Sequence, residues 1–88
     1  MSQLPFTIAD LLRHLYGLRT RPLEVRATSE ATKWGLAALR RCLVRLEKAG
    51  IVQFLGKDCW RLNRSYDDAN ALLLAARKAG IDVDRIDV

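Results

Sequence analysis

Cysteine, histidine and aromatic residues are scarce in this chain of 88 residues, which has two Cys, one His and an aromatic content of 7%. Cys42 and Cys59 do not form a C-x-x-C pair, and with His14 they supply too few ligands for a metal site. No apolar run approaches the roughly 20 residues that a membrane-spanning helix needs. The sequence therefore predicts no metal, no cofactor and no membrane segment.

Motifs of catalysis are missing as well. Paired carboxylates, a phosphate-binding loop and a nucleophile next to a base are all absent from the sequence. His14 shares the polar side of its expected helix with Asp10 and Arg13, and we interpret it as a solvated surface residue. We therefore predict that the protein is not an enzyme, and no set of residues predicts a pocket for a small-molecule effector.

The length and the first residues indicate one domain in the cytoplasm. The opening MSQLPFTIAD lacks the basic segment and long apolar run of a signal peptide. Half of the residues are apolar, which argues against disorder. We expect one domain over residues 1–88, with a core and hairpin at 1–64, a C-terminal helix at 65–80 and a short tail at 81–88.

Positive charge is what the sequence has in excess. The net charge is +5, and it is uneven. Residues 1–64 contain twelve Lys and Arg against five Asp and Glu, a net +7, whereas residues 65–88 contain three against five, a net −2. The basic part suits a polyanion and favours nucleic acid as a partner. The alternative is charge that serves solubility alone.

The first helix is expected to begin after Thr7, a good N-cap with Asp10 in the first turn. Gly17 is expected to end it. Its apolar stripe comprises Ile8, Leu11, Leu12, Leu15 and Tyr16. Arg19 and Arg21 lie in the loop that follows, where they either reach a phosphate or face water.

A short half-buried strand is predicted at Leu23 and Val25, which alternate with polar residues. A second helix is predicted from about residue 27 to 34, with Thr28 or Ser29 as its N-cap. Its inner side comprises Ala27, Ala31 and Trp34.

A tight connection at residues 35–37 is expected to lead into a third helix at 38–49, which Gly50 ends. The alternative, one helix over 29–49, would carry Gly35 at a cost of about 1 kcal/mol. Leucines recur here at steps of three and four residues, as Leu36, Leu39, Leu43 and Leu46. The predicted core side comprises Leu39, Cys42, Leu43 and Leu46, with Cys42 as a small buried apolar residue.

Residues 51–62 change to the period of strands and predict a β-hairpin with its turn at 56–58 and Trp60 and Leu62 on one face. A fourth helix follows the capping arrangement of Ser65 and Asp68 and runs to about residue 79. Its stripe comprises Ala69, Leu72, Leu73 and Ala76. Gly80 ends it, and residues 81–88 form a short strand or a loose tail.

This order of elements resembles the winged helix-turn-helix family. The residues that carry the resemblance are Trp34-Gly35-Leu36 at the turn and the following RRCLVRLEKAGIVQF, a basic helix that ends in Leu-Glu-x-Ala-Gly-Ile-Val. The resemblance covers about residues 22–62. It implies an α+β winged helix with a three-helix core, a short β-hairpin wing and an additional C-terminal helix. Two departures are the short hairpin and the alanines at 37 and 38, where many members carry Ser or Thr.

The third helix is the expected DNA-reading element, because the B-DNA major groove is about 12 Å wide and admits one helix. Arginine donates two hydrogen bonds to guanine or holds a phosphate, and an alanine packs only against a thymine methyl group. The residues expected to read bases are Ala37, Ala38, Arg40, Arg41 and Val44. The residues expected to bind phosphates are Lys33, Arg45, Lys48, Lys57 and Arg61.

We therefore expect sequence-specific binding of double-stranded DNA by a small transcriptional regulator that associates with the nucleoid. A homodimer through the fourth helix would double the base contacts, and Leu74 lies off the core stripe of that helix. The alternative function is a protein–protein interaction subunit of a larger nucleic-acid-associated assembly. The acidic, apolar C-terminal segment favours it, and the four cations against one acid in residues 36–49 disfavour it.

Overall fold

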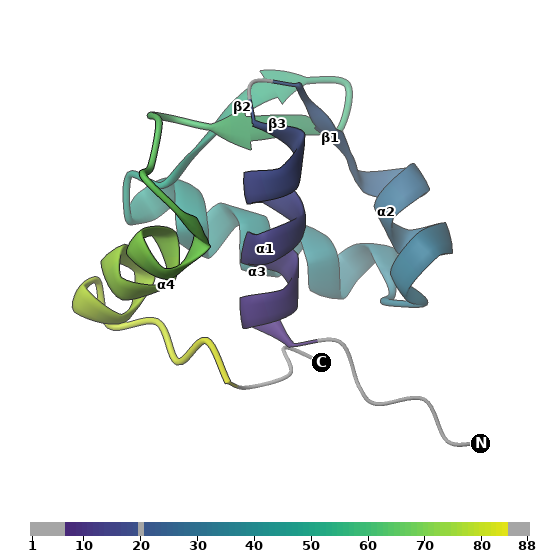
Figure 1. Cartoon of the computed structure of the whole chain (residues 1–88). Coiled ribbons are helices and arrows are strands. Elements are labelled where there is room, and N and C mark those ends of the chain that lie inside the picture. Colours follow the sequence, from purple (N-terminus) through teal and green to yellow (C-terminus); the bar gives the residue numbers. More distant parts are fainter. Residues whose placement is uncertain (1–6, 20, 85–88) are drawn as a thin grey trace.

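The structure, a computed structural model, describes residues 7–19 and 21–84 of the chain. In this part it is an α+β fold of four helices and one three-stranded antiparallel sheet, which confirms the predicted class. The elements are α1 (Ile8–Leu18), β1 (Leu23–Glu24), α2 (Val25–Thr32), α3 (Leu36–Lys48), β2 (Val52–Gly56), β3 (Cys59–Leu62) and α4 (Ala69–Lys78). The sheet lies at one end of the molecule, and α1 crosses in front of α3 between α2 and α4 (Figure 1).

The core is apolar and takes residues from every helix and strand. The stripe predicted for α1 is confirmed, since Ile8, Leu11, Leu12 and Leu15 are buried. The core side predicted for α3 is confirmed too, since Leu39, Cys42, Leu43 and Leu46 are at most 1% exposed. Leu36 repeats the leucine spacing but is 37% exposed, because it stands in the first turn, beyond the edge of the core.

The start of α1 is fixed as expected, but its end is not. Thr7 and Asp10 form a reciprocal capping box, in which the Asp10 amide donates to Thr7 Oγ1 at 3.2 Å and the Thr7 amide donates to Asp10 Oδ2 at 3.1 Å. The expected stop at Gly17 is wrong. The helix continues to Leu18, and the chain turns at Arg19, which has a φ of 56° and donates its amide to the last carbonyls.

The second helix begins two residues earlier than predicted. Val25, expected in the strand, opens α2, and its amide donates to the Asp58 carbonyl of the hairpin at 3.0 Å. Thr28 and Ser29 lie inside α2 and do not cap it; the Thr28 hydroxyl donates to the Glu24 carbonyl at 2.9 Å. Val25 and Thr28, three residues apart on one side of α2, are its buried residues. The predicted inner residues Ala27 and Ala31 are exposed, and Trp34 is buried but lies beyond the helix.

Two separate helices replace the alternative of one long helix over 29–49. Lys33 takes a left-handed conformation with a φ of 66°, and Gly35 is the N-cap of α3. Consequently α3 starts at residue 36 and not at 38, which places the expected connection residues 36 and 37 inside it. Gly50 ends α3 as predicted, with a φ of 78°. Its amide and that of Ile51 return to the carbonyls of residues 47 and 46, which satisfies the helix end.

The hairpin of β2 and β3 is confirmed, with its two-residue turn at Lys57 and Asp58. Both have positive φ, 53° and 58°, as a type I′ turn requires. An irregularity between Phe54 and Gly56 makes Leu55 the extra residue of a bulge. The pairing of β1 with β3, which makes the hairpin part of a sheet, was not predicted.

The fourth helix is shorter at its start than predicted. Asp68 is the N-cap, its side chain accepting from the Ala71 amide at 2.8 Å, and Ser65 lies outside the helix. The expected strand or loose tail after Gly80 is wrong for residues 81–84: they form no strand, and Val83 is buried with its carbonyl bonded to the Ala9 amide at 2.7 Å. Residues 85–88 lie outside the described part. Within the described residues, no helix has the length and apolar character to cross a membrane.

Candidate nucleic-acid interface

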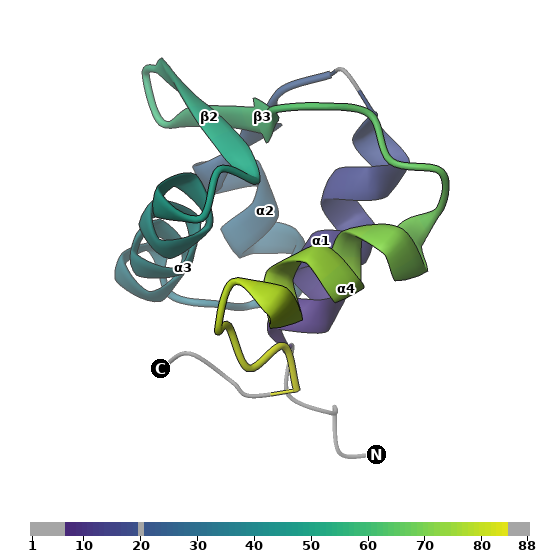
Figure 2. The same ribbon diagram turned by 90° about the vertical axis from the view of Figure 1, so that its left-hand side faces the viewer.

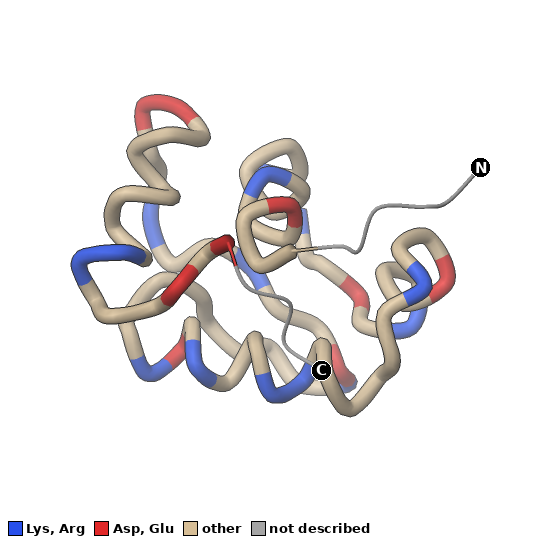
Figure 3. The backbone as a smooth tube through the Cα atoms, turned by 90° about the horizontal axis from the view of Figure 1, so that it is seen from below, with Lys and Arg blue, Asp and Glu red and all other residues tan. Residues whose placement is uncertain are grey.

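The exposed side of α3 lies at the edge of the molecule, and the β2–β3 hairpin projects above it on the same side (Figure 2). Ala37, Arg41, Val44 and Lys48 recur at steps of three and four residues, which places them along one line of the helix. All four are exposed, and Val44 is 38% exposed although it is apolar. Lys and Arg segments recur along α3 in Figure 3, at the lower edge of that view.

Arg40 and Arg45 flank this line on its two sides, and both are exposed. We call Arg40, Arg41, Arg45 and Lys48 the α3 cationic surface. Glu47 is the acid of this helix. The structure thus brings together the predicted base-reading residues on α3 with two of the predicted phosphate ligands. Among the predicted base-reading residues, Ala38 is the exception, because it is half-buried and packs against the core.

Arg40 has a partner that the sequence did not reveal. Its Nε donates to Asp58 Oδ1 at 3.2 Å and its Nη2 to Asp58 Oδ2 at 2.7 Å, a two-pronged ion pair between α3 and the hairpin turn. The Arg40 and Asp58 side chains are 46% and 39% exposed, so the pair lies at the surface. The hydrogen bond to Arg40 lowers the pKa of Asp58 below its ordinary value, and the pKa of Arg40 is raised by the same contact.

Arg26 is a second residue that sequence reasoning missed. It lies exposed on α2, one residue after the amide that binds the Asp58 carbonyl. Its charge also lowers the pKa of Asp58. The Asp58 carboxylate is therefore bound by a cation of α3 and lies within the electrostatic field of a cation of α2. No local sequence signal joins these residues, because the contact depends on how the hairpin folds over α3.

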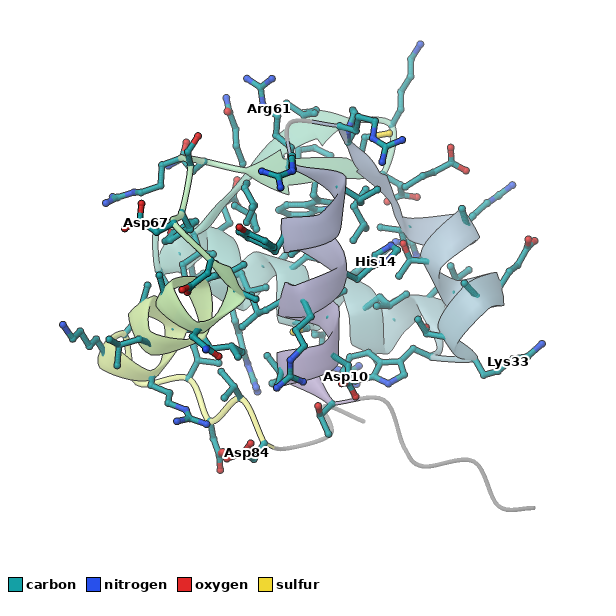
Figure 4. All side chains as sticks on the ribbon, in the orientation of Figure 1. Asp10, His14, Lys33, Arg61, Asp67 and Asp84 are labelled. Carbon is teal, nitrogen blue, oxygen red and sulfur yellow. The ribbon has the colours of Figure 1, made fainter. Side chains whose placement is uncertain are left out.

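The other predicted phosphate ligands do not gather at one place. Lys57 is exposed in the hairpin turn next to Asp58. Figure 4 shows Lys33 at the end of α2, at the lower right, and Arg61 on the sheet, at the top of the view. Lys33, Lys57 and Arg61 are all exposed, but only Lys57 adjoins the contact between α3 and the hairpin.

Potential metal ligands do not gather in the part of the chain that the structure describes. No group of three or more His, Cys, Asp or Glu is placed there to hold a metal ion. His14 is exposed, as predicted, whereas Cys42 is buried and Cys59 is half-buried. The candidate site of the described residues is therefore the α3 cationic surface, whose long side chains are exposed.

The lowered pKa of Asp58 gives a first prediction. Since folding lowers this pKa, the ion pair stabilises the folded protein above the pKa of the unfolded chain, and this contribution is lost as the pH falls through the folded value. In a carboxyl-carbon NMR titration we expect Asp58 to have a midpoint below that of an ordinary aspartate, and Arg40→Ala to move it upward. A midpoint that does not move in the variant would show that Arg40 is not its main partner.

No protein-family model, curated protein or solved structure matches this chain.

Proposed function

We propose that the protein binds double-stranded DNA sequence-specifically through α3, as a small transcriptional regulator of the winged-helix type. One observation carries the proposal: α3 is wholly buried along one side and exposes the α3 cationic surface on the other. A helix that enters the major groove needs both, because its apolar side holds it to its own domain and its polar side makes the contacts. The α+β arrangement, with a hairpin beside α3, is compatible with this fold.

The roles follow from position on the helix. Arg41, Val44 and Ala37 lie along the centre of the exposed side and are proposed to face the bases. Arg45 and Lys48, which lie at its border and its C-terminal end, are proposed to hold phosphates, together with Lys57 of the hairpin. Lys33 and Arg61 would reach only the outer parts of a bound duplex.

Selection of bound sequences from a random duplex pool tests this function. We expect enrichment of one motif, and a palindrome if the protein binds as the proposed homodimer. The dimer stays a prediction, with Leu74 of α4 as the contact residue that is 52% exposed. Failure to retain any duplex at low salt would contradict DNA binding.

Lys48→Ala gives a prediction for phosphate binding. The variant is expected to weaken binding to all duplex sequences alike and to reduce the slope of log K against log salt by about one, because one phosphate contact is lost. Affinity measured between low and moderate salt gives the slope. Lys78→Ala is the matched control, since Lys78 is also the exposed last residue of its helix, α4. Equal slopes for both variants would place Lys48 outside the interface.

Exposed apolar residues on the hairpin favour the second candidate function, a protein-contact subunit of a nucleic-acid-associated assembly. Phe54 is 47% exposed although its ring packs against Trp60 at a centroid distance of 4.7 Å, and Leu55 of the bulge is 40% exposed. Large apolar side chains side by side on a surface are common in protein interfaces. Binding to an immobilised acidic protein, with no binding to duplex DNA, would favour this function over the first.

A further inference from the structure

The ion pair of Arg40 with Asp58 occupies the edge of the surface that is proposed to meet DNA. A carboxylate bound by two parallel hydrogen bonds from a guanidinium has the geometry with which arginine also binds a phosphate group. The Arg40 guanidinium thus has the geometry to hold a phosphate in the same way as it holds the Asp58 carboxylate.

Three features hold this acid in place. The Asp58 carbonyl accepts the Val25 amide at 3.0 Å, which fastens the turn to the start of α2. The Asp58 carboxylate accepts two hydrogen bonds from Arg40 of α3, and Arg26 adds a second positive charge to its field. The guanidinium of Arg40 is therefore an anion-binding group, and the anion that it binds in the free protein is a carboxylate of the same chain.

We propose that Arg40 forms a backbone-phosphate site of the DNA interface, which Asp58 occupies in the free protein and vacates when a phosphate replaces its carboxylate. This inference rests on the proposed function. It assigns Arg40 to a phosphate and not to a base. Because both side chains are half-exposed, breaking their ion pair costs little free energy, and a phosphate is able to replace the carboxylate. The exchange weakens binding to every duplex by a constant factor, so that contacts by the central residues of α3 decide which sequences are retained.

Asp58→Asn tests the exchange. Asparagine tolerates the positive φ of this position, so the turn keeps its conformation. We expect the variant to bind duplexes of any sequence roughly 2–5-fold more tightly, the factor that corresponds to an exposed ion pair. A carboxylate that instead holds Arg40 in place for DNA would give the opposite sign, because its loss would weaken binding. Weaker or unchanged binding by Asp58→Asn overturns the proposal.

Two controls separate the exchange from a general effect of charge. Glu47→Gln removes the same charge from α3 and is expected to give a smaller gain. In an Arg40→Ala background, Asp58→Asn is expected to gain no more than Glu47→Gln, since no ion pair remains to be broken. Arg40→Ala alone is expected to reduce the salt slope by about one, as loss of a phosphate contact does. An unchanged slope overturns the phosphate assignment.

The same measurements distinguish failure of this inference from failure of the proposed function. If neither the native chain nor Asp58→Asn binds a duplex at low salt, DNA binding itself is wrong and the exchange is wrong with it. If the native chain binds DNA and Asp58→Asn does not bind more tightly, only the exchange is wrong.

Discussion

Arg41→Ala is expected to weaken binding to the preferred DNA site by about 1–3 kcal/mol, or about 5–150-fold, and to relax the sequence preference at one position. Arg41 lies in the middle of the exposed side of α3, and none of the ion pairs between described residues involves it. Its guanidinium is therefore available to two acceptors of one guanine. Affinities for the selected site and for variants of each base pair measure both effects.

Arg77→Ala is the matched control for this prediction. It removes the same charge from an exposed helical arginine, but on α4, where Arg77 pairs with Asp84 at 3.6 Å. The control is expected to lower affinity slightly and for all sequences alike. If the two variants lose the same affinity without any change in preference, Arg41 contributes only general charge and the base-reading role is wrong.

Local signals in the sequence were sufficient to predict features that depend on a single helix, such as its buried side or one of its ends. The leucine spacing placed the buried side of α3, and Thr7 with Asp10 placed the start of α1. Gly50 marked the end of α3 because a left-handed residue is needed there, and glycine supplies it at no steric cost. Each of these depends on residues that are at most a few positions apart.

The features that the sequence did not reveal depend on contacts between segments that are distant in the chain. The start of α2 is set by the bond from Val25 to the Asp58 carbonyl, which overrides the capping preference of Thr28. The partner of Arg40 lies 18 residues away in the chain. The bond from Val25 adjoins the pairing of β1 with β3, and no periodic pattern in so short a strand predicts that pairing. The contacts of individual site residues were therefore harder to predict from the sequence than the α+β class.

Leu43→Ala is expected to lower the free energy of unfolding by roughly 2–5 kcal/mol, because it removes a fully buried side chain and leaves a cavity. A chain of this length has a stability of about 4–13 kcal/mol from typical values per residue. The loss is therefore a large part of the total, and we expect a clear fall in the denaturant midpoint monitored by circular dichroism. DNA binding is expected to fall only in proportion to the unfolded fraction, since the side chain faces away from the α3 cationic surface.

Leu74→Ala is the control that separates a cavity from a change of residue type. Leu74 is also a helical leucine but is 52% exposed, so its loss is expected to change stability by no more than about 0.5 kcal/mol. Comparison at one low protein concentration keeps any dimer contact of Leu74 out of the result. If Leu43→Ala is as stable as Leu74→Ala, Leu43 does not fix α3 to the core.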